Sequence, residues 1–309
     1  MLANFLTVGQ QVVILFILIG VGFVCGKTKF LSDAAVTGMT DFVLYIVTPC
    51  VMIQAFQRPF EAALAGAFFQ ALLFTIIIIA LSYSIARCTL RDQNLQRQSV
   101  YRFAAIFSNC GFMALPLENA LLGADGMFFG AAFLAVSNVL CWTLGLYMMS
   151  HNRRLLSLRR LVTNPGVLGV AVGLVLFFTS SSLPALIDTP IDYFAALNTP
   201  LPMIVIGYHL SHAKILQIFR DGRAWLTIAE RLVIIPLAGL AVGLLLHMDP
   251  TALVACIVAL CAPTAAVCTM FSVIYGQDSE LSVSLVSLST LLSIITMPLI
   301  IVLTQMLCA

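Results

Sequence analysis

Charge is the property that this sequence has least of. Charged side chains make up 9% of its 309 residues, whereas hydrophobic residues make up 61%. Soluble domains carry about 25% charged residues, so this chain cannot cover a folded surface for water. Its formal net charge of +2 is too small to indicate nucleic acid as a partner. The composition therefore predicts an integral membrane protein, with the lipid bilayer as its surroundings.

Several other features are missing. The chain has nine cysteines but no Cys-x-x-Cys pair, and most of them lie inside apolar segments. They are expected to be small apolar filler, so no disulfide, metal or cofactor is predicted. No signal peptide is evident, because the apolar segment 5–25 is too long for an h-region and lacks a basic n-region and a cleavage site. No linker is long enough to separate a soluble domain.

Long apolar runs are what the sequence does contain. Few of their residues alternate with a period of two, so helices are favoured over a β-barrel. We predict an all-α membrane protein of ten helices, each close to the ~20 residues that a bilayer requires. Their expected ranges are 5–26, 34–56, 62–86, 100–122, 126–149, 165–180, 194–211, 224–247, 251–274 and 281–306.

Basic residues are divided unequally between the two ends of these helices. Arg58 is alone on one side. Fourteen lie on the other: Lys27, Lys29, Arg87, Arg91, Arg97, Arg102, Arg153, Arg154, Arg159, Arg160, Lys214, Arg220, Arg223 and Arg231. Short cytoplasmic loops carry the excess of Lys and Arg, so the second side is predicted to be cytoplasmic. The expected location is the inner (plasma) membrane, as a multi-pass protein with both termini outside.

Weak internal symmetry relates the two halves. The segment beginning at Val47 is echoed 151 residues later at Asn198, and the one beginning at Leu122 is echoed 153 residues later at Tyr275. We therefore predict two inverted five-helix repeats, 1–150 with helices 1 to 5 and 151–309 with helices 6 to 10. Chance matching of Gly, Pro and Asp in loops is the alternative.

Two of the predicted helices are interrupted by small, polar and helix-breaking residues. The first interruption lies in 107–116, within FSNCGFMALP, and the second in 261–266, within CAPTAA. Lipid cannot satisfy the backbone groups that a broken helix exposes, so such a break must face protein or a wet cavity. A pair of broken membrane helices, one in each half, is typical of a secondary transporter.

The two breaks predict an anion site. If they cross, two half-helix N-termini converge near the middle of the membrane, each carrying about half a positive charge and free N–H donors. Ser108 and Asn109 can cap the half-helix that begins after them, and Pro263 fits the first turn of a new helix. A carboxylate is the natural ligand. The candidate substrate-binding residues are Ser108, Asn109, Cys110, Gly111, Asn138, Pro263, Thr264 and Ala265.

Ionisable residues are expected away from this site. At 1.5 Å per residue, Asp41 lies about 12 Å along its helix from Pro49, toward the cytoplasmic side, and Glu118 lies about 13 Å from Asn109, toward the outer side. Glu230 and Arg231 are expected near the cytoplasmic end of helix 8, snorkelling or paired with each other. No ionisable side chain is predicted at mid-depth, which disfavours a proton antiporter with a buried carboxylate pair.

Several motifs resemble those of the auxin efflux carrier family, especially its bacterial members. NCGFMALPL at 109–117 resembles the fourth-helix motif, and WTLG at 142–145 resembles a fifth-helix motif. PTAA at 263–266 followed by YGQD at 275–278 resembles the ninth-helix motif. The resemblance covers essentially the whole chain. In plant members a proline marks the crossing in both helices; Pro263 matches the second, but Ser108 stands in place of the first.

The resemblance implies a fold related to bile acid symporters and sodium/proton antiporters. Helices 1, 2, 6 and 7 would form a scaffold, and helices 3–5 and 8–10 a moving transport domain with crossed helices 4 and 9. Bacterial relatives are associated with small carboxylates such as malate or malonate. The long cytoplasmic loop of plant carriers is missing.

The sequence thus predicts a secondary transporter of a small organic anion (malate, malonate or an auxin-like acid) by elevator-type alternating access, exporting its substrate. A sodium- or proton-coupled symporter on the same fold is the first alternative. The second, from another class, is a membrane sensor or intramembrane enzyme. The oligomeric state is open, with a homodimer as one option.

Overall fold

The computed structural model describes residues 2–153, 163–213 and 218–308, and all of its regular elements there are helical. The α-helices are α1 (Leu2–Lys27), α2 (Asp33–Phe42), α3 (Thr48–Phe56), α4 (Ala62–Thr89), α5 (Leu95–Ile106), α6 (Leu115–Leu140), α7 (Leu146–Ser150), α9 (Pro165–Thr179), α10 (Ala185–Ala196), α11 (Pro200–His212), α13 (Gly222–Ala229), α14 (Ile235–Leu245), α15 (Pro250–Cys261), α16 (Val267–Ile274) and α17 (Ser279–Cys308). Wider π-helical turns are η1 (Val43–Val47), η2 (Cys110–Ala114), η3 (Cys141–Gly145) and η5 (Glu230–Ile234).

Among the described residues, six helical stretches are long and apolar enough to cross a membrane. They are Gly9–Lys27, Asp33–Phe56, Ala62–Thr89, Cys110–Ser150, Gly222–Leu245 and Ser279–Cys308. Pro165–Thr179 and Pro250–Cys261 are shorter apolar helices. The chain is therefore a multi-pass membrane protein built from helices, as its composition predicts.

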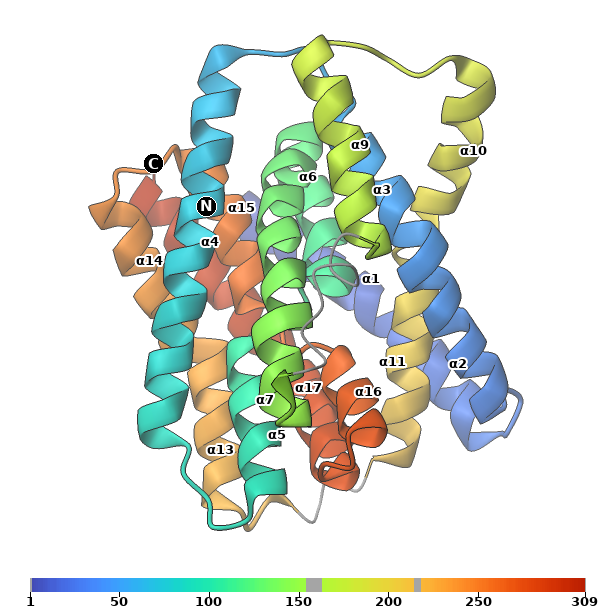
Figure 1. Ribbon diagram of the computed structural model, residues 1–309, viewed down its shortest axis with the longest axis vertical. Helices are drawn as coiled ribbons and strands as arrows, with labels where there is room; N and C mark the ends of the chain where they lie inside the picture. Colours follow the sequence, from blue (N-terminus) through green and yellow to red (C-terminus); the bar gives the residue numbers. More distant parts are fainter. Residues whose placement is uncertain (1, 154–162, 214–217, 309) are drawn as a thin grey trace.

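Two groups of helices pack side by side. In the first helix group, α1 packs on α11, α3 on α9 and α10, and α2 on α11. The second helix group holds α4 to α7 and α13 to α17, in which α15 packs against α4, α6, α14 and α17. Figure 1 shows α2, α3, α9, α10 and α11 on one side, α4, α13 and α14 on the other, and α6 between them.

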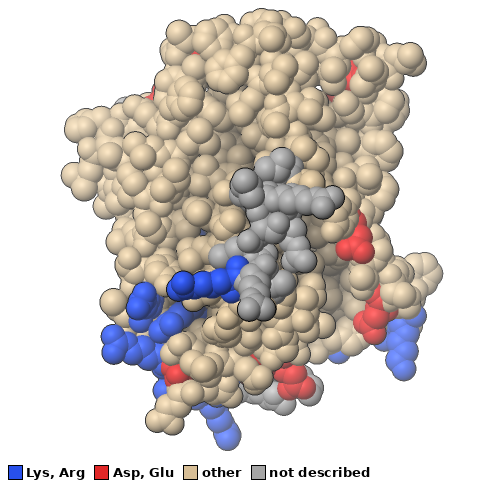
Figure 2. All heavy atoms as spheres, in the orientation of Figure 1, with Lys and Arg blue, Asp and Glu red and all other residues tan. Residues whose placement is uncertain are grey.

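Basic side chains gather toward one end of the helices on the visible face (Figure 2). Figure 2 shows the Lys and Arg side chains in the lower half of the molecule, where α4 turns into α5 and α1 turns into α2 (Figure 1). We call this end the basic face. Arg154, Arg159, Arg160 and Lys214 lie outside the described residues.

Three of the π-helical turns run directly into a helix with a proline in its first two positions. η1 precedes Pro49, η2 precedes Pro116 and η5 precedes Pro236. A proline has no N–H to donate and its ring crowds the carbonyl one turn back. A wider turn at that place relieves the clash but leaves carbonyl groups without their usual partner. The position of the prolines thus determines where the helices open to other donors.

The range predicted for the seventh helix, 194–211, differs from the structure. Helix α10 ends at Ala196 and α11 begins at Pro200, so residues 197–199 form a turn inside the expected span. Helix α10 also covers residues that were expected to be a loop. Pro200 is the physical reason for the new start, because it fits the first helical position and cannot continue an incoming helix.

Helices α1 and α11 approach each other closely through glycine. A Cβ added at Gly207 would lie 2.0 Å from the carbonyl oxygen of Ile19, and one at Gly22 would lie 2.2 Å from that of Ile204. Small residues at such crossings let two backbones meet, which is the main source of helix association in lipid. The first helix group therefore depends on these two positions.

We expect Gly207→Ala to lower the melting temperature of the purified protein, with a loss of about 1–3 kcal/mol of stability, because backbone atoms must move apart. Gly20→Ala is the matched control, since nothing lies within 4 Å of a Cβ there. Equal melting temperatures for the two variants would contradict this packing.

Candidate functional site

The two interruptions expected from the sequence are present and lie against each other. Helix α5 ends at Ile106 and α15 ends at Cys261, and each is followed by extended backbone. Ser108 and Thr264 form an isolated antiparallel bridge. Around it, the amide of Asn109 donates to the carbonyl of Pro263 at 2.7 Å, and the amide of Ala265 donates to that of Phe107 at 3.0 Å. Ser108 in place of a proline therefore does not prevent the first break.

The crossing brings together two helix C-termini, whose last carbonyl groups have no partner within their own helix. The guanidinium of Arg231, on η5, satisfies them. It donates to the carbonyl oxygens of Ala105 at 3.0 Å and Ile106 at 2.8 Å, at the end of α5. It also donates to Leu260 near the end of α15. One side chain thus caps both half-helices.

The expectation that Arg231 snorkels or pairs with Glu230 at the membrane surface is wrong. Its side chain is fully buried, and none of the described ion pairs joins it to Glu230. Glu118, which was expected along its helix away from the break, is also fully buried. The rise per residue along one helix gives the position of a Cα atom, but it does not show where a long side chain such as that of Arg231 ends.

The second break also forms hydrogen bonds with α5 and α17. The hydroxyl of Thr264 donates to the carbonyl of Ala104 at 3.1 Å, while its amide donates to the hydroxyl of Ser289 at 3.2 Å. Ser289 belongs to α17, which also carries Thr290 and Ser293. The hydroxyls of Thr290 and Ser293 instead bond to carbonyl groups of their own helix.

The two N-termini at the crossing remain open. Neither η2, which begins at Cys110, nor α16, which begins at Val267, has a side-chain cap. The Asn109 side chain is 5% exposed, and its amide nitrogen has no hydrogen-bond partner among the described residues. A buried donor without a partner costs about 1–3 kcal/mol. This point of the fold therefore offers unused donors together with two positive helix ends.

A cavity of about 70 Å³ lies at these ends. Ser108, Asn109, Cys110, Gly111, Asn138 and Ala265 line it. Pro263 and Thr264, the other two candidate residues, do not. Their polar backbone atoms and the Thr264 hydroxyl are engaged in the bonds between the broken helices, so they build the wall behind the cavity.

The cavity also has polar side chains that sequence reasoning left out. Thr48 and Ser137 line it, as does Asn198 from the turn before α11. The Asn198 amide donates to the carbonyl of Gly111 at 3.0 Å. This carbonyl lacks a helical partner, because the amide of Leu115 bonds to Cys110 and the following residue is Pro116. A proline that follows a break by about two turns is the sequence signal that could have prompted a search for this donor.

A second cavity, of about 380 Å³, continues from the first toward the basic face. Leu44, Phe112, Ala266 and Val267 line both cavities. It lies between α2 and α11 of the first helix group and α16 of the second, and it extends to Asp33 at the start of α2. We call it the vestibule. The site therefore opens toward the basic face.

Aromatic side chains fill the boundary between the groups on the opposite face. Phe56 of α3, Phe68 of α4, Phe128 of α6 and Phe177 of α9 are all buried. The Phe128 ring centroid lies 5.5 Å from Phe56, 5.2 Å from Phe68 and 5.0 Å from Phe177. These four residues, the phenylalanine cluster, join both helix groups above the site. Such pairs contribute about 0.5–1.5 kcal/mol each beyond their burial.

Arg58, the basic residue alone on that side, strengthens this closure. It follows α3, and its guanidinium lies 5.1 Å from the centre of the Phe128 ring. It also forms an ion pair with Asp125 of α6 at 2.8 Å. One arginine therefore links the first helix group to the second by charge and by its contact with an aromatic face.

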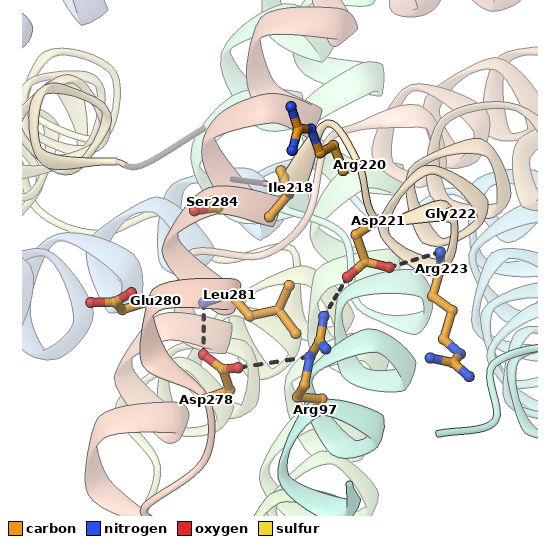
Figure 3. A pocket seen from close by; sticks show the side chains of 10 residues that line it. All are labelled: Arg97, Ile218, Arg220, Asp221, Gly222, Arg223, Asp278, Glu280, Leu281 and Ser284. Atoms are coloured by element: carbon orange, nitrogen blue, oxygen red, sulfur yellow. Dashed lines mark hydrogen bonds and ion pairs between the residues drawn. The ribbon is translucent and has the colours of Figure 1, made fainter. Parts of the chain in front are cut away.

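A further cavity, of about 810 Å³, lies elsewhere, at the basic face. In Figure 3, Arg97 of α5 points between Asp221, before α13, and Asp278, before α17. Three arginines and three acids line this cavity, so their charges offset one another. It ties the ends of three helices of the second group together, and nothing in it favours an anion.

Known proteins share this chain's pattern over nearly its whole length. The family model described as Membrane transport protein matches twice, at residues 7–156 and 151–301. An uncharacterized transporter of Methanothermobacter thermautotrophicus is 22% identical over 297 residues, which cover 94% of this chain and 96% of that protein.

We expect Arg231→Met to destabilise the protein by about 3–5 kcal/mol, because it leaves the buried carbonyl groups of Ala105, Ile106 and Leu260 without this donor, at about 1–3 kcal/mol each. Arg231→Lys should be intermediate, since an ammonium is a point charge without the planar fork of a guanidinium. The melting temperature in detergent measures both, with the exposed Arg220→Met as control. A wild-type melting temperature for Arg231→Met would contradict the capping role.

Proposed function

The chain belongs to the auxin efflux carrier family of membrane transport proteins, and on this premise we propose that it carries a small organic anion across the membrane at the crossing of its two broken helices. It is a transporter and not an enzyme, so the alternative of an intramembrane enzyme falls away. The observation that carries the proposal is the unpartnered Asn109 amide, in a cavity between two uncapped helix N-termini.

The charges at the crossing favour a carboxylate. Each helix end carries about half an elementary charge, so the two C-termini sum to about −1 and the two N-termini to about +1. The guanidinium of Arg231 offsets the C-termini. The N-termini are left to attract one negative group, which the Asn109 amide can receive with a hydrogen bond. Among the described residues that line the cavity, none is basic, so the backbone supplies this attraction.

The anion would be held by donor groups that take no part in the bonds of the crossing. They are the first amides of η2 at Cys110 and Gly111, those of Ala266 and Val267 before and in α16, and the side chains of Asn109 and Asn138. Ser108 lines the same cavity. The amides of Thr264 and Ala265 bond to Ser289 and Phe107, so their part is to hold the crossing in place.

Ten membrane helices in two inverted repeats are part of the proposal. The family model matches each half of the chain once, which supports two related halves. Each helix group takes helices from both halves of the chain. The first group contains the predicted helices 1, 2, 6 and 7, and the second contains helices 3–5 and 8–10. The first group would be the scaffold, and the second would move across the membrane as an elevator.

This conformation would be the inward-facing one. The basic face would be cytoplasmic by the positive-inside rule. The vestibule reaches that face, while the phenylalanine cluster and the pair of Arg58 with Asp125 close the opposite side. Alternating access would require this closure to open and the bond from Asn198 to Gly111 to break, because each joins one helix group to the other.

Export needs no coupling ion. A membrane potential that is negative inside drives an anion outward by about 2.3 kcal/mol per charge per 100 mV. A sodium-coupled symporter is disfavoured by Arg231, because its guanidinium already supplies a positive charge beside the crossing. The cavity is small and the vestibule is largely apolar, so short monocarboxylates and dicarboxylates such as malate and malonate form the first panel to test.

We expect proteoliposomes with the purified protein to exchange radiolabelled carboxylates from this panel without sodium. Asn109→Ala should reduce exchange at least tenfold, since a lost hydrogen bond to a charged group is worth about 1.5–3 kcal/mol. Ser293→Ala, within the second group but outside the cavity, is the control. Unchanged binding and exchange by Asn109→Ala would reject this site, and strict sodium dependence would favour the symporter.

We also expect Phe128→Ala and Arg58→Gln to favour the outward-facing state, because each weakens the closure. A variant that keeps only Cys141, which lines the cavity, reports this through labelling with a membrane-impermeant thiol reagent applied from outside. The labelling rate should rise several-fold in the Phe128→Ala and Arg58→Gln variants and stay low in the Arg220→Gln variant. Identical labelling rates in all variants would contradict the closure.

A further inference from the structure

Glu118 is a buried acid that the proposed transport site does not use. It lies in the first turn of α6 and is 0% exposed. Neither of its carboxylate oxygens has a hydrogen-bond partner among the described residues. An acid in this situation is unusual, since intramembrane ionisable residues are expensive and mark functional positions.

The fold makes a place for this side chain. Gly123, with φ of +60°, interrupts α6 and turns the chain back, so that its two parts lie together. Gly126 and Gly130, one turn apart, face Glu118 from the second part. A Cβ at Gly130 would lie 1.6 Å from the Glu118 Oε2 atom, and one at Gly126 would lie 2.3 Å from its carbonyl oxygen. Gly126 thus lets the two backbones approach, and Gly130 leaves a notch that the carboxyl group fills.

Nothing charged compensates Glu118 in this notch. The ionisable groups whose charges would act on it are the thiols of Cys110 on η2 and of Cys256 and Cys261 on α15. Arg58, the basic residue of that side, is engaged with Asp125. Of the other elements packed on α6, α9 has no ionisable side chain. The rest carry Cys25 and Lys27 on α1, Cys50 on α3, Tyr83, Arg87 and Cys88 on α4, and Cys141 on η3.

An ionised carboxylate in such surroundings costs several kcal/mol, and no partner is present to offset that cost. A neutral carboxyl group costs far less, although its hydroxyl still lacks an acceptor. We propose that Glu118 is a proton-binding site, which holds a proton in the conformation seen here and releases it to water when a change of conformation hydrates the notch.

The release balances simply: the carboxyl group becomes a carboxylate, and the proton passes to water that reaches the notch. By linkage, a ligand that binds one conformation better shifts the population toward it. Protons then favour the enclosed conformation, so transport becomes sensitive to pH through a residue outside the substrate cavity. This coupling rests on the proposed function, whereas the proton site itself does not.

Infrared spectroscopy of the purified protein tests the site without any substrate. At about pH 7, where a free glutamate is ionised, the wild type should show a protonated-carboxyl C=O band. The intensity of that band should fall in Glu118→Gln and in Glu118→Met and stay unchanged in the exposed Glu61→Gln. Any band that remains in the Glu118 variants would belong to Glu230, which is also buried without a partner for its carboxylate oxygens among the described residues. Glu118→Met should fold well, because it replaces a neutral buried group by an apolar one. A band of undiminished wild-type intensity in both Glu118 variants overturns the proposal.

Transport assays test the coupling. The initial rate of exchange in proteoliposomes, measured over a series of external pH values, should vary several-fold in the wild type and become flat in Glu118→Gln. A profile in Glu118→Gln that matches the wild type overturns the coupling. If no carboxylate of the panel is transported while the infrared band behaves as expected, the proposed function fails and the proton site stands.

Discussion

The capping of two half-helices by Arg231 is the interaction on which the rest of the structure depends. A membrane helix broken at mid-depth exposes carbonyl groups at one end and amides at the other, and lipid satisfies neither. Here one guanidinium takes the carbonyl ends of both α5 and α15. Its planar fork of donors suits such a task better than an ammonium. With the negative ends of the crossing neutralised, the positive ends can face the cavity without an opposing field. Stability and the proposed binding site thus share one side chain.

The two helix groups meet around this crossing by contacts of different strength on the two faces. Toward the basic face a vestibule separates α2 and α11 from α16. On the other face the phenylalanine cluster and Arg58 fill the boundary. At the site, Asn198 reaches across to a carbonyl group that Pro116 leaves without a partner. Aromatic contacts, one ion pair and one hydrogen bond are interactions that a rigid-body movement can exchange, whereas the bonds within the crossing lie inside the second group and can travel with it.

Much of the candidate site could be predicted because its causes are local. Ser108, Asn109 and Pro263 interrupt helices by their own conformational preferences, and each break appears where these residues stand. The expectation of positive helix ends comes from the direction of the chain alone. What could not be predicted is how far side chains and backbone groups reach across the fold to find their partners. Thr264 and Ala265 were expected to receive the anion, but their amides are taken up by Ser289 and Phe107, residues far away in sequence. Arg231 was expected at the membrane surface because its neighbours in sequence are close to that surface.

Composition and the order of residues by themselves determined that this protein is a helical membrane protein, where two of its helices break and which family motifs it carries. Hydrophobicity and backbone preference act over a few residues, so neighbouring positions in the chain are enough to reveal them. Only the tertiary structure decided which side chains meet at the breaks, that six of the eight candidates line one cavity, and that the Glu118 carboxyl group fills a notch at Gly130. The physical reason is that hydrogen bonds and burial depend on distance in space, and packing brings together residues that are not neighbours in the chain.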